Sequence, residues 1–273
     1  MLLCQISDLH IKVPGALSYG IVDTAEALRR CVDHILALPQ RPDAVVATGD
    51  LTDFGRPDEY AHLRALLAPL AMPVYLMPGN HDDRDALRAA FPDHAYLRQT
   101  SPHIQFAIDA GPLHVLALDT TVPGESGGAL DADRLDWLAA RLHEARERPV
   151  VILMHHPPFA TGIGHIDEIG LADWGPLEAI ARGHPNIERI LCGHVHRPID
   201  VRFAGTIAQT CPSPAHQVVL DLAPDAANAF VLEPPGFRLH LWNPPFGLVT
   251  HTAFIGRFDG PYPFHDAAGV LID

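Results

Sequence analysis

The sequence is poor in lysine and has no long apolar run. Lys12 is the only lysine among 273 residues, and 19 basic residues stand against 33 acidic ones, for a formal charge of −14. Because no basic cluster is present either, we expect no nucleic-acid partner. No apolar stretch approaches the roughly 20 residues that span a bilayer, so we expect no membrane partner. The opening segment MLLCQISD lacks the basic residues of a signal peptide, which favours a cytoplasmic location.

The sequence also lacks a CxxC pair. Its four cysteines are scattered, and we expect them to be buried free thiols. They are Cys4, Cys31, Cys192 and Cys211. Hydrophobic residues make up 48 % and charged residues 19 % of the chain, which is ordinary for a globular protein and excludes disorder as the main state. The length allows one large domain, or one domain with a smaller addition.

Short apolar runs alternate with amphipathic stretches through most of the chain. The runs are continuous, as in strands buried on both faces, and the stretches between them show helical spacing of apolar residues. This alternation predicts the α/β class. The expected strands are Leu2–Ile6, Ala44–Ala47, Val74–Met77, Leu113–Leu118, Val150–Met154 and Arg189–Cys192. The expected helices are Val22–Leu38, Pro57–Ala68, Asp131–Arg148 and Asp173–Arg182.

The last quarter of the chain has a different pattern. His216–Leu222 is typical of a strand, and Phe237–Trp242 alternates apolar with polar residues. The turn at Asn243–Gly247 leads into a return strand over Leu248–Ile255, so we predict a β-hairpin. Because an isolated hairpin is not stable in water, it must cover a site, contact another copy or pack onto its own domain.

Aspartate, asparagine and histidine residues follow five of the expected strands, where each strand ends. Ligands of open α/β sheets bind beside the carboxyl ends of the strands, so these groups should converge. Residues at i and i+2 of an extended segment point the same way, which pairs Asp8 with His10 and His194 with His196. The groups are Asp8-Leu9-His10, Gly49-Asp50, Gly79-Asn80-His81-Asp82, His155-His156-Pro157 and Gly193-His194-Val195-His196.

The chemistry of this collection is metal binding. Carboxylate, amide and imidazole ligands without thiolate suit Mn, Fe, Co, Ni or Zn. Seven candidates are too many for one four-coordinate ion, but they suit two ions if one carboxylate bridges and water fills the open positions. The candidates are Asp8, His10, Asp50, Asn80, His155, His194 and His196. We expect the neighbouring Asp53, Asp119 and His156 to cap helices or to hydrogen-bond nearby groups rather than to bind metal.

The set DxH, GD, GNHD, HH and GHxH, in this order, resembles the calcineurin-like metallophosphoesterases. The likeness spans Met1 to about Val218. Within the family, the segments MLLCQISDLH, SYG, RPDAVVATGD, PGNHDD, MHHPP and AHQV are most similar to bacterial glycerophosphodiesterases, and the class III cyclic-nucleotide phosphodiesterases are close. The resemblance implies a four-layer α-β-β-α sandwich with a C-terminal β-hairpin appendage. Residues 1–223 would form the catalytic domain, and residues 224–273 a hairpin and tail that act as a lid or oligomerisation element.

The resemblance also implies roles for single residues. One metal would be held by Asp8, His10, Asp50 and His196, and the second by Asp50, Asn80, His155 and His194. The two ions would be Fe, Mn, Zn or Co. His81 would contact the substrate or its leaving group, and Asn80, Tyr19 and His216 would also contact the substrate. The GNHD motif ends in Asp82, where many phosphatases of the family have Glu.

Two divalent ions suit the hydrolysis of a phosphoester by metal-bound hydroxide. Two dications give +4 and Asp8 and Asp50 subtract 2, so the site would attract one phosphate group, whereas a long polyanion would meet the acidic surface. We therefore predict a phosphodiesterase for small phosphodiesters, with glycerophosphodiesters as the first choice, 3′,5′-cyclic nucleotides as the second and phosphomonoesters as the third. A non-catalytic interaction module should lack some ligands, and none is missing. A homo-oligomer is expected.

Overall fold

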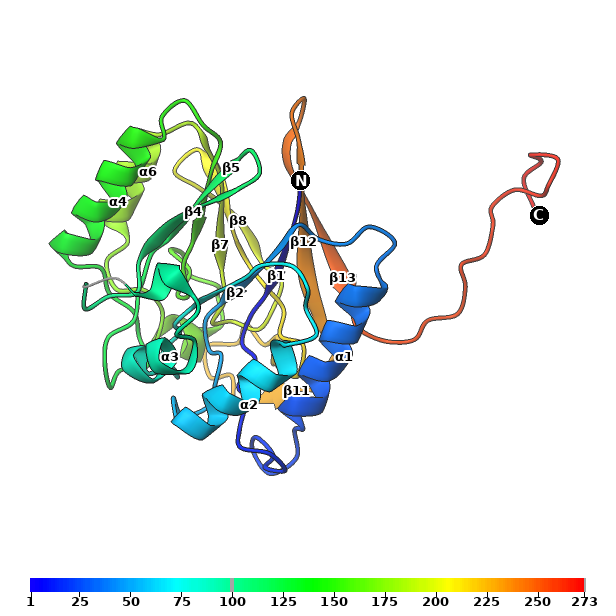
Figure 1. The fold of residues 1–273 in the computed structure, drawn as a ribbon, viewed down its shortest axis with the longest axis horizontal. Helices are drawn as coiled ribbons and strands as arrows, with labels where there is room; N and C mark the ends of the chain where they lie inside the picture. Colours follow the sequence, from blue (N-terminus) through cyan, green and yellow to red (C-terminus); the bar gives the residue numbers. More distant parts are fainter. Residues whose placement is uncertain (99–100, 273) are drawn as a thin grey trace.

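Two stacked β-sheets lie between two layers of helices in the computed structural model, which describes residues 1–98 and 101–272 (Figure 1). The first sheet has the order β13-β12-β1-β2-β3, and the second has the order β4-β5-β6-β7-β9-β8. This arrangement confirms the predicted α-β-β-α sandwich. The strands are β1 (Leu2–Ile6), β2 (Ala44–Thr48), β3 (Val74–Met77), β4 (Phe106–Ala110), β5 (Leu113–Ala117), β6 (Val150–Leu153), β7 (Ile187–Cys192), β8 (Asp200–Phe203), β9 (Thr206–Thr210), β10 (Gln217–Val218), β11 (Phe230–Val231), β12 (Gly236–Asn243) and β13 (Gly247–Phe254).

The longer helices cover the outer faces of the two sheets. Leu28 of α1 and Leu63 of α2 pack with the strands of the first sheet, and Leu138 of α4 and Leu177 of α6 pack with the second. Figure 1 shows these two helical layers on opposite sides of the molecule. The helices are α1 (Thr24–Ala37), α2 (Pro57–Leu67), α3 (Arg84–Ala90), α4 (Ala132–Glu144), α5 (Gly164–Asp167) and α6 (Gly175–Arg182), with a short 3₁₀ helix at Ala95–Leu97.

Most helix ends follow from local sequence. The carboxylates of Asp23 and Asp131 accept backbone hydrogen bonds at the starts of α1 and α4, and Pro57 occupies the first position of α2. Helix α4 ends at Glu144, earlier than the expected Arg148. Arg148 precedes Pro149, and a residue before proline is sterically driven out of the helical conformation.

The C-terminal hairpin forms the edge of the first sheet. Strand β12 pairs antiparallel with β1, with Leu241 opposite Leu2, and β13 pairs only with β12. Phe237 on β12 is fully buried in the core between the first sheet and its helices. The hairpin therefore packs onto its own domain, while the division at residue 223 and the role as a lid or oligomer contact stay predictions. The expected strand His216–Leu222 is shorter, because β10 pairs with only two residues of β11.

A buried polar contact fixes how the two sheets stack. The Gln5 side-chain amide on β1 donates to the Thr48 hydroxyl on β2 and to the Cys192 carbonyl on β7, at 3.0 and 2.9 Å. The Gln5 Oε1 atom lies 3.2 Å from Nε2 of His240 on β12. These contacts join the first sheet to the second directly below the ends of β1, β2 and β7, where the predicted ligands begin.

Two expectations from composition can be compared with the fold. All four cysteines are buried and free, as predicted. Within residues 1–98 and 101–272, no helix has the length and apolar character needed to cross a membrane.

Candidate metal centre

The seven predicted ligands lie in loops at one edge of the two sheets. Strands β1, β2 and β3 of the first sheet and β6 and β7 of the second end at this edge, so both sheets contribute. All seven side chains are buried except that of Asn80, which is half-buried. Asp8 and His10 follow β1, Asp50 follows β2, Asn80 follows β3, His155 follows β6, and His194 and His196 follow β7.

Asp50 lies at the centre of the cluster. Its Oδ2 atom is 3.6 Å from Nε2 of His10, and its Oδ1 atom is 3.4 Å from Nε2 of His155. On the His10 side, the ligand atoms of Asp8, His10, Asp50 and His196 all lie within 4.8 Å of one another. These four residues can surround one cation.

A second group lies on the other side of Asp50. The Asn80 Oδ1 atom is 3.0 Å from Nε2 of His155 and 3.2 Å from Nδ1 of His194. Together with Asp50 Oδ1, these atoms offer a second set of oxygen and nitrogen ligands. The two carboxylate oxygens of Asp50 therefore face two separate groups, which is the arrangement that a bridging ligand requires.

Three of the imidazoles are oriented from outside the cluster. Each turns Nδ1 toward an acceptor, so in the neutral ring Nδ1 carries the proton and Nε2 is left to face the cluster. A hydrogen bond of this kind fixes the ring of a metal-binding histidine. The pairs are His10 with the Asp53 carboxylate at 3.2 Å, His155 with the Thr48 carbonyl at 2.8 Å and His196 with the His216 carbonyl at 3.1 Å.

Lone pairs and carboxylate oxygens converge in the cluster without enough donors to satisfy them. The Nε2 atoms of His10 and His196 are 3.1 Å apart, and in the neutral rings with the protons on Nδ1 both would carry lone pairs. Among the described residues, Asp8 Oδ2 is buried and has no hydrogen-bond partner. Lone pairs and carboxylate oxygens that converge in this way are satisfied by a cation, so the residues present fit a metal site.

The backbone of the cluster is strained. Eight non-glycine residues in the described part of the chain have a positive φ, and five of them are predicted ligands. These are Asp8 (56°), His10 (46°), Asp50 (49°), His194 (71°) and His196 (56°). A left-handed conformation of this kind costs about 1–3 kcal/mol for each residue and concentrates at functional sites. The strain turns consecutive side chains of the loops toward one point.

Two glycines allow the ligand loops to approach one another. Gly49 has φ +96°, and a Cβ atom there would collide with the His155 ring and with the backbone of Gly79. A Cβ atom at Gly79 would collide with the Asp50 backbone nitrogen and carboxylate. A glycine directly precedes both Asp50 and Asn80 in the sequence. A side chain at either position would not leave room for the two ligand loops to lie this close together.

Burial and local charge set the protonation of the ligands. Burial lowers the pKa of His196 well below its usual range and that of His194 to about 3, so both rings are neutral and able to bind metal. Burial opposes ionisation of Asp50, but the positive charge of protonated His155 and His81 outweighs it and holds the pKa of Asp50 well below its usual range. The central carboxylate is therefore ionised at neutral pH. Asp50 in return raises the pKa of His155 to about 9, so a metal ion at this position would displace a proton from His155.

His81 lies beside the cluster, with a ring nitrogen within 4.8 Å of possible ligand atoms of His10 and Asp53. Its backbone N–H donates to Asp50 Oδ1 at 2.9 Å, and its Nδ1 donates to the Asp53 carbonyl at 2.8 Å. The ring contacts His10 edge-on, with 4.7 Å between centroids. Its Nε2 remains available at the half-exposed edge of the site.

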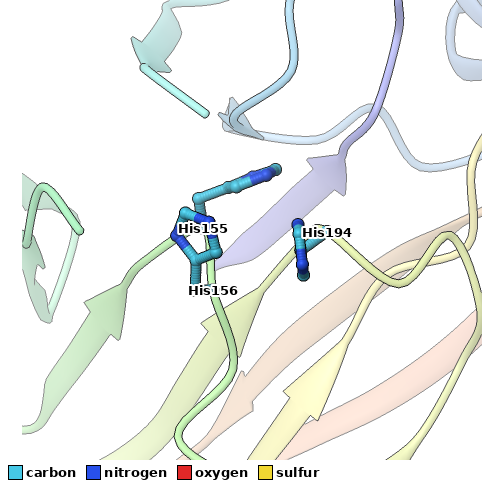
Figure 2. Close-up of side chains that lie close together, drawn as sticks. All are labelled: His155, His156 and His194. Atoms are coloured by element: carbon cyan, nitrogen blue, oxygen red, sulfur yellow. The ribbon is translucent and has the colours of Figure 1, made fainter. Parts of the chain in front are cut away.

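His156 also lies next to the cluster, although the sequence did not place it among the ligands. His155, His156 and His194 have ring nitrogens within 4.8 Å of one another, and Figure 2 shows them at the ends of β6 and β7. The rings of His155 and His156 are almost perpendicular, at 87°. Both nitrogens of His156 are already engaged, by the Thr120 hydroxyl at 2.8 Å and the Ser126 carbonyl at 3.1 Å. Its ring supports the loops around the site.

The two predicted pocket residues belong to an aromatic cluster, which we define as Tyr19, His216 and Phe230. Tyr19 lies 5.4 Å from His216 and 4.8 Å from Phe230 between ring centroids, and His216 lies 4.7 Å from His196. The cluster therefore extends outward from the His196 side of the metal centre. Phe230 was not found from the sequence, because it lies on the two-residue strand β11 outside every recognisable motif.

Asp53 and Asp119, which were expected to cap helices or to hydrogen-bond nearby groups, both bond neighbouring groups. Asp53 faces Nδ1 of His10 and forms an ion pair with Lys12 at 2.6 Å. Asp119 is fully buried and holds the Arg84 guanidinium, at 2.7 Å between Oδ2 and Nε. Neither residue lies among the ligand atoms of the two groups around Asp50.

Asp82, whose role the sequence left open, joins the loops after β2 and β3. Its carboxylate accepts backbone hydrogen bonds from Leu51, Thr52 and Gly79, at 3.0, 3.2 and 2.9 Å. It also accepts a hydrogen bond from the hydroxyl of Tyr60 at 2.8 Å. Asp82 therefore holds the two loops that present Asp50 and Asn80 at a fixed separation.

Comparison with known proteins gives the family. The family model described as calcineurin-like phosphoesterase matches residues 1–198, which is most of the chain. The chain belongs to the calcineurin-like phosphoesterase family. This membership, with the clustered Asp and His side chains, confirms the expected metal-dependent phosphoesterase.

Individual members of the calcineurin-like phosphoesterase family are similar over long stretches. A probable glycerophosphodiester phosphodiesterase GpdQ from Arcobacter nitrofigilis is 39 % identical over 274 residues, which is 100 % of both chains. A 3′,5′-cyclic adenosine monophosphate phosphodiesterase CpdA from Pseudomonas aeruginosa is 32 % identical over 87 % of this chain and 84 % of its own. A dimetal phosphatase structure from Danio rerio has a TM-score of 0.61 at 17 % identity, covering 94 % of this chain and 99 % of its own, and supports the fold.

The contacts of Asp82 lead to a test of how the loops are held. In Asp82→Asn, one acceptor oxygen becomes a donor and leaves buried backbone N–H groups unpaired, so the free energy of unfolding should fall by about 1–3 kcal/mol. The matched control is Asp83→Asn, because Asp83 caps α3 through Ala86 and asparagine caps equally well. Urea denaturation of both variants would measure the difference. Equal stability of the two variants would contradict this role for Asp82.

Proposed function

We propose that the protein is a binuclear phosphodiesterase that hydrolyses small phosphodiesters, with glycerophosphodiesters as its preferred substrates. The observation that carries this choice is the match at 39 % identity, over the full length of both chains, to a relative named as a probable glycerophosphodiester phosphodiesterase. The relative named as a cyclic AMP phosphodiesterase is 32 % identical over 87 % of the chain. Cyclic nucleotides are therefore the second candidate.

The proposed ligands of the first ion are Asp8, His10, Asp50 and His196, and those of the second are Asp50, Asn80, His155 and His194. The distances around Asp50 support this division, because each carboxylate oxygen faces one group. The donor set of carboxylate, amide and imidazole suits Fe, Mn, Zn or Co. When bound, two divalent ions supply positive charge for phosphate oxygens and lower the pKa of a coordinated water.

The charge around the site favours a small substrate. Lys12, the only lysine of the sequence, is paired with Asp53 at 2.6 Å, so it is not free to bind a chain of phosphates. The chain as a whole carries a formal charge of −14, which repels long polyanions such as nucleic acids. A single phosphodiester group is attracted only at the metal centre itself.

His81 is proposed to assist the leaving group. Its Nδ1 proton is directed to the Asp53 carbonyl, and this contact fixes the ring and leaves Nε2 to act on the substrate. An alkoxide such as that of glycerol is a poor leaving group and gains from a proton or a hydrogen bond. Nε2 of His81 is the group of this chain that is placed to provide it.

The aromatic cluster of Tyr19, His216 and Phe230 is proposed to contact the alcohol portion of the substrate. It adjoins the metal centre through His216, which lies 4.7 Å from His196 between ring centroids. Tyr19 is exposed and has φ +52°, a strained conformation for a bulky residue that displays its ring at the loop tip. We also propose a cytoplasmic location and a homo-oligomer.

The substrate assignment is tested by a hydrolysis panel on the enzyme reconstituted with Mn²⁺, Fe²⁺, Co²⁺ or Zn²⁺. The panel contains glycerophosphocholine, glycerophosphoethanolamine, cyclic AMP and matched phosphomonoesters. We expect the highest kcat/KM for the glycerophosphodiesters, by about tenfold or more. A higher kcat/KM for cyclic AMP would select the second candidate, and no turnover with any metal would contradict an enzymatic role.

The bridging role of Asp50 is tested by metal content. Asp50→Ala removes a carboxylate that faces both groups, so both ions should be lost or weakened and turnover nearly abolished. Asn80→Ala is the matched comparison, because Asn80 belongs to one group only and its loss should affect one ion. Metal analysis after gel filtration measures both variants, with circular dichroism as the control for folding. A fully loaded Asp50→Ala protein would overturn the assignment.

The role of His81 is tested by comparing leaving groups. His81→Ala should slow alkyl phosphodiesters by about 10²–10⁴-fold, the usual contribution of general acid catalysis. Bis(4-nitrophenyl) phosphate should be affected far less, because nitrophenolate leaves without a proton. The exposed His143 on α4 gives the control variant His143→Ala. Equal losses on both substrates would indicate phosphate positioning instead, and lost metal would make His81 a ligand.

A further inference from the structure

Three buried polar side chains are hydrogen-bonded to one another in the core between the two sheets. They are His240 on β12, Gln5 on β1 and Thr48 at the end of β2, and we call them the inter-sheet network. All three side chains are fully buried, and buried polar groups are hydrogen-bonded in almost every protein core. The network begins on the C-terminal hairpin and ends at the edge of the sheets where the predicted ligands lie.

The direction of each hydrogen bond in the network follows from its partners. The Cys192 carbonyl can only accept, so the Gln5 atom that lies 2.9 Å from it is the amide nitrogen. Gln5 Oε1 then faces Nε2 of His240 at 3.2 Å, and this ring nitrogen must carry the proton. Burial lowers the pKa of His240 to about 3, so the ring is neutral and its Nδ1 accepts from the Thr250 hydroxyl at 2.9 Å. His240 is therefore held as a single tautomer that donates to Gln5.

The Gln5 amide joins the last residues of two strands from different sheets. Its nitrogen donates to the hydroxyl of Thr48, which ends β2, and to the carbonyl of Cys192, which ends β7. Asp50 follows two residues after the first of these, and His194 follows two residues after the second. One side chain therefore fixes the separation of two loops that carry predicted ligands.

Thr48 extends the network to a third predicted ligand. Because its hydroxyl accepts from Gln5, its own proton is donated to Ser7 Oγ at 2.8 Å. Its carbonyl accepts from His155 Nδ1 at 2.8 Å and from the Ser7 hydroxyl at 3.3 Å. A Cβ atom at Gly193 would collide with the Ser7 hydroxyl and the Thr48 carbonyl, so the two ligand loops meet here without a gap.

The histidines that the inter-sheet network supports belong to the group proposed for the second ion. His155 is held at its Nδ1 atom, and the loop of His194 is held where β7 ends. The rings of His10 and His196, proposed for the first ion, are oriented by acceptors outside the network. Loss of the network should therefore change the affinity for the second ion more than the affinity for the first.

We propose that Gln5, held by His240 of the C-terminal hairpin, is a positioning residue that sets the affinity of the second metal site. The inference rests on the proposed function, because it uses the division of the ligands between two ions. Groups that orient metal ligands from outside the site typically change metal affinity by about 10–100-fold when they are removed. The hairpin then contributes to the metal centre within its own chain, because His240 completes the hydrogen bonds that hold Gln5.

Gln5→Met and His240→Phe test this role. Each replaces a hydrogen-bonding side chain by an apolar one of similar size, so it breaks the network with little change in packing. Titration of the metal-free protein with Co²⁺ measures the dissociation constant of each ion, and the visible absorption of bound Co²⁺ reports the geometry of its ligands. In both variants the second dissociation constant should rise about tenfold or more and the absorption of that ion should change, whereas the first constant should stay within about twofold.

His240→Gln is the matched rescue variant. Its amide nitrogen can reach the position of the ring Nε2 and donate to Gln5 Oε1, so the second dissociation constant should return toward the wild-type value. The two substitutions of His240 differ in whether a donor faces Gln5, and they keep the test decisive if Gln5→Met does not fold. Equal affinities of His240→Gln and His240→Phe for the second ion would contradict the proposal.

Phe237→Leu is the control for a general loss of stability. Phe237 is fully buried on β12 and its ring lies 5.7 Å from that of His34 on α1, so the substitution weakens the packing of the hairpin and keeps every hydrogen bond of the network. It should lower the free energy of unfolding and leave both Co²⁺ dissociation constants unchanged. An equal loss of affinity in Phe237→Leu, or wild-type affinity in Gln5→Met, would overturn the proposal. A wild type that binds fewer than two Co²⁺ ions would instead contradict the binuclear centre of the proposed function, so the two failures can be told apart.

Discussion

The position of the Asp50 carboxylate between two histidines from different sheets is the constraint on which the rest of the structure depends. Its oxygens lie 3.6 Å from His10, which follows β1 of the first sheet, and 3.4 Å from His155, which follows β6 of the second. A shift of one sheet against the other by a residue would separate these groups. The buried Gln5 side chain, bonded to Thr48 and to the Cys192 carbonyl, fixes that relation just below the site.

Much of this arrangement can be predicted from the sequence, because it follows from local rules. The apolar runs that became β1, β2, β3, β6 and β7 are short and continuous, as buried parallel strands are. Since the carboxyl ends of such strands meet at one edge, ligand-type residues placed directly after them must converge. This convergence of strand ends can be inferred without any distance, and it correctly predicted that all seven candidate ligands lie close together. It also located His81 at the rim, since adjacent residues in a turning chain point in different directions.

Other features depend on contacts between distant segments and could not be predicted in the same way. Phe230 reaches the aromatic cluster only because β11 pairs with β10 beside His216. The pairing of β12 with β1 joins residues more than two hundred positions apart, and an alternating strand gives no sign of which edge it will extend. Asp82 could be recognised in its motif. Its role in joining the loops after β2 and β3 could not, because it depends on hydrogen bonds that form only when the two loops meet in the fold.

The strain in the ligand loops has a consequence for how the protein is stabilised. Five predicted ligands have left-handed backbones, each at a cost of about 1–3 kcal/mol, and the buried Asp8 Oδ2 has no hydrogen-bond partner within the described chain. The burial of apolar side chains in the two cores offsets these costs. A cation bound only by the folded chain adds to that stability in proportion to its affinity. The cores therefore hold the ligands in a geometry that the loops alone would not adopt. A bound metal ion would offset part of the free-energy cost of the strained ligand loops.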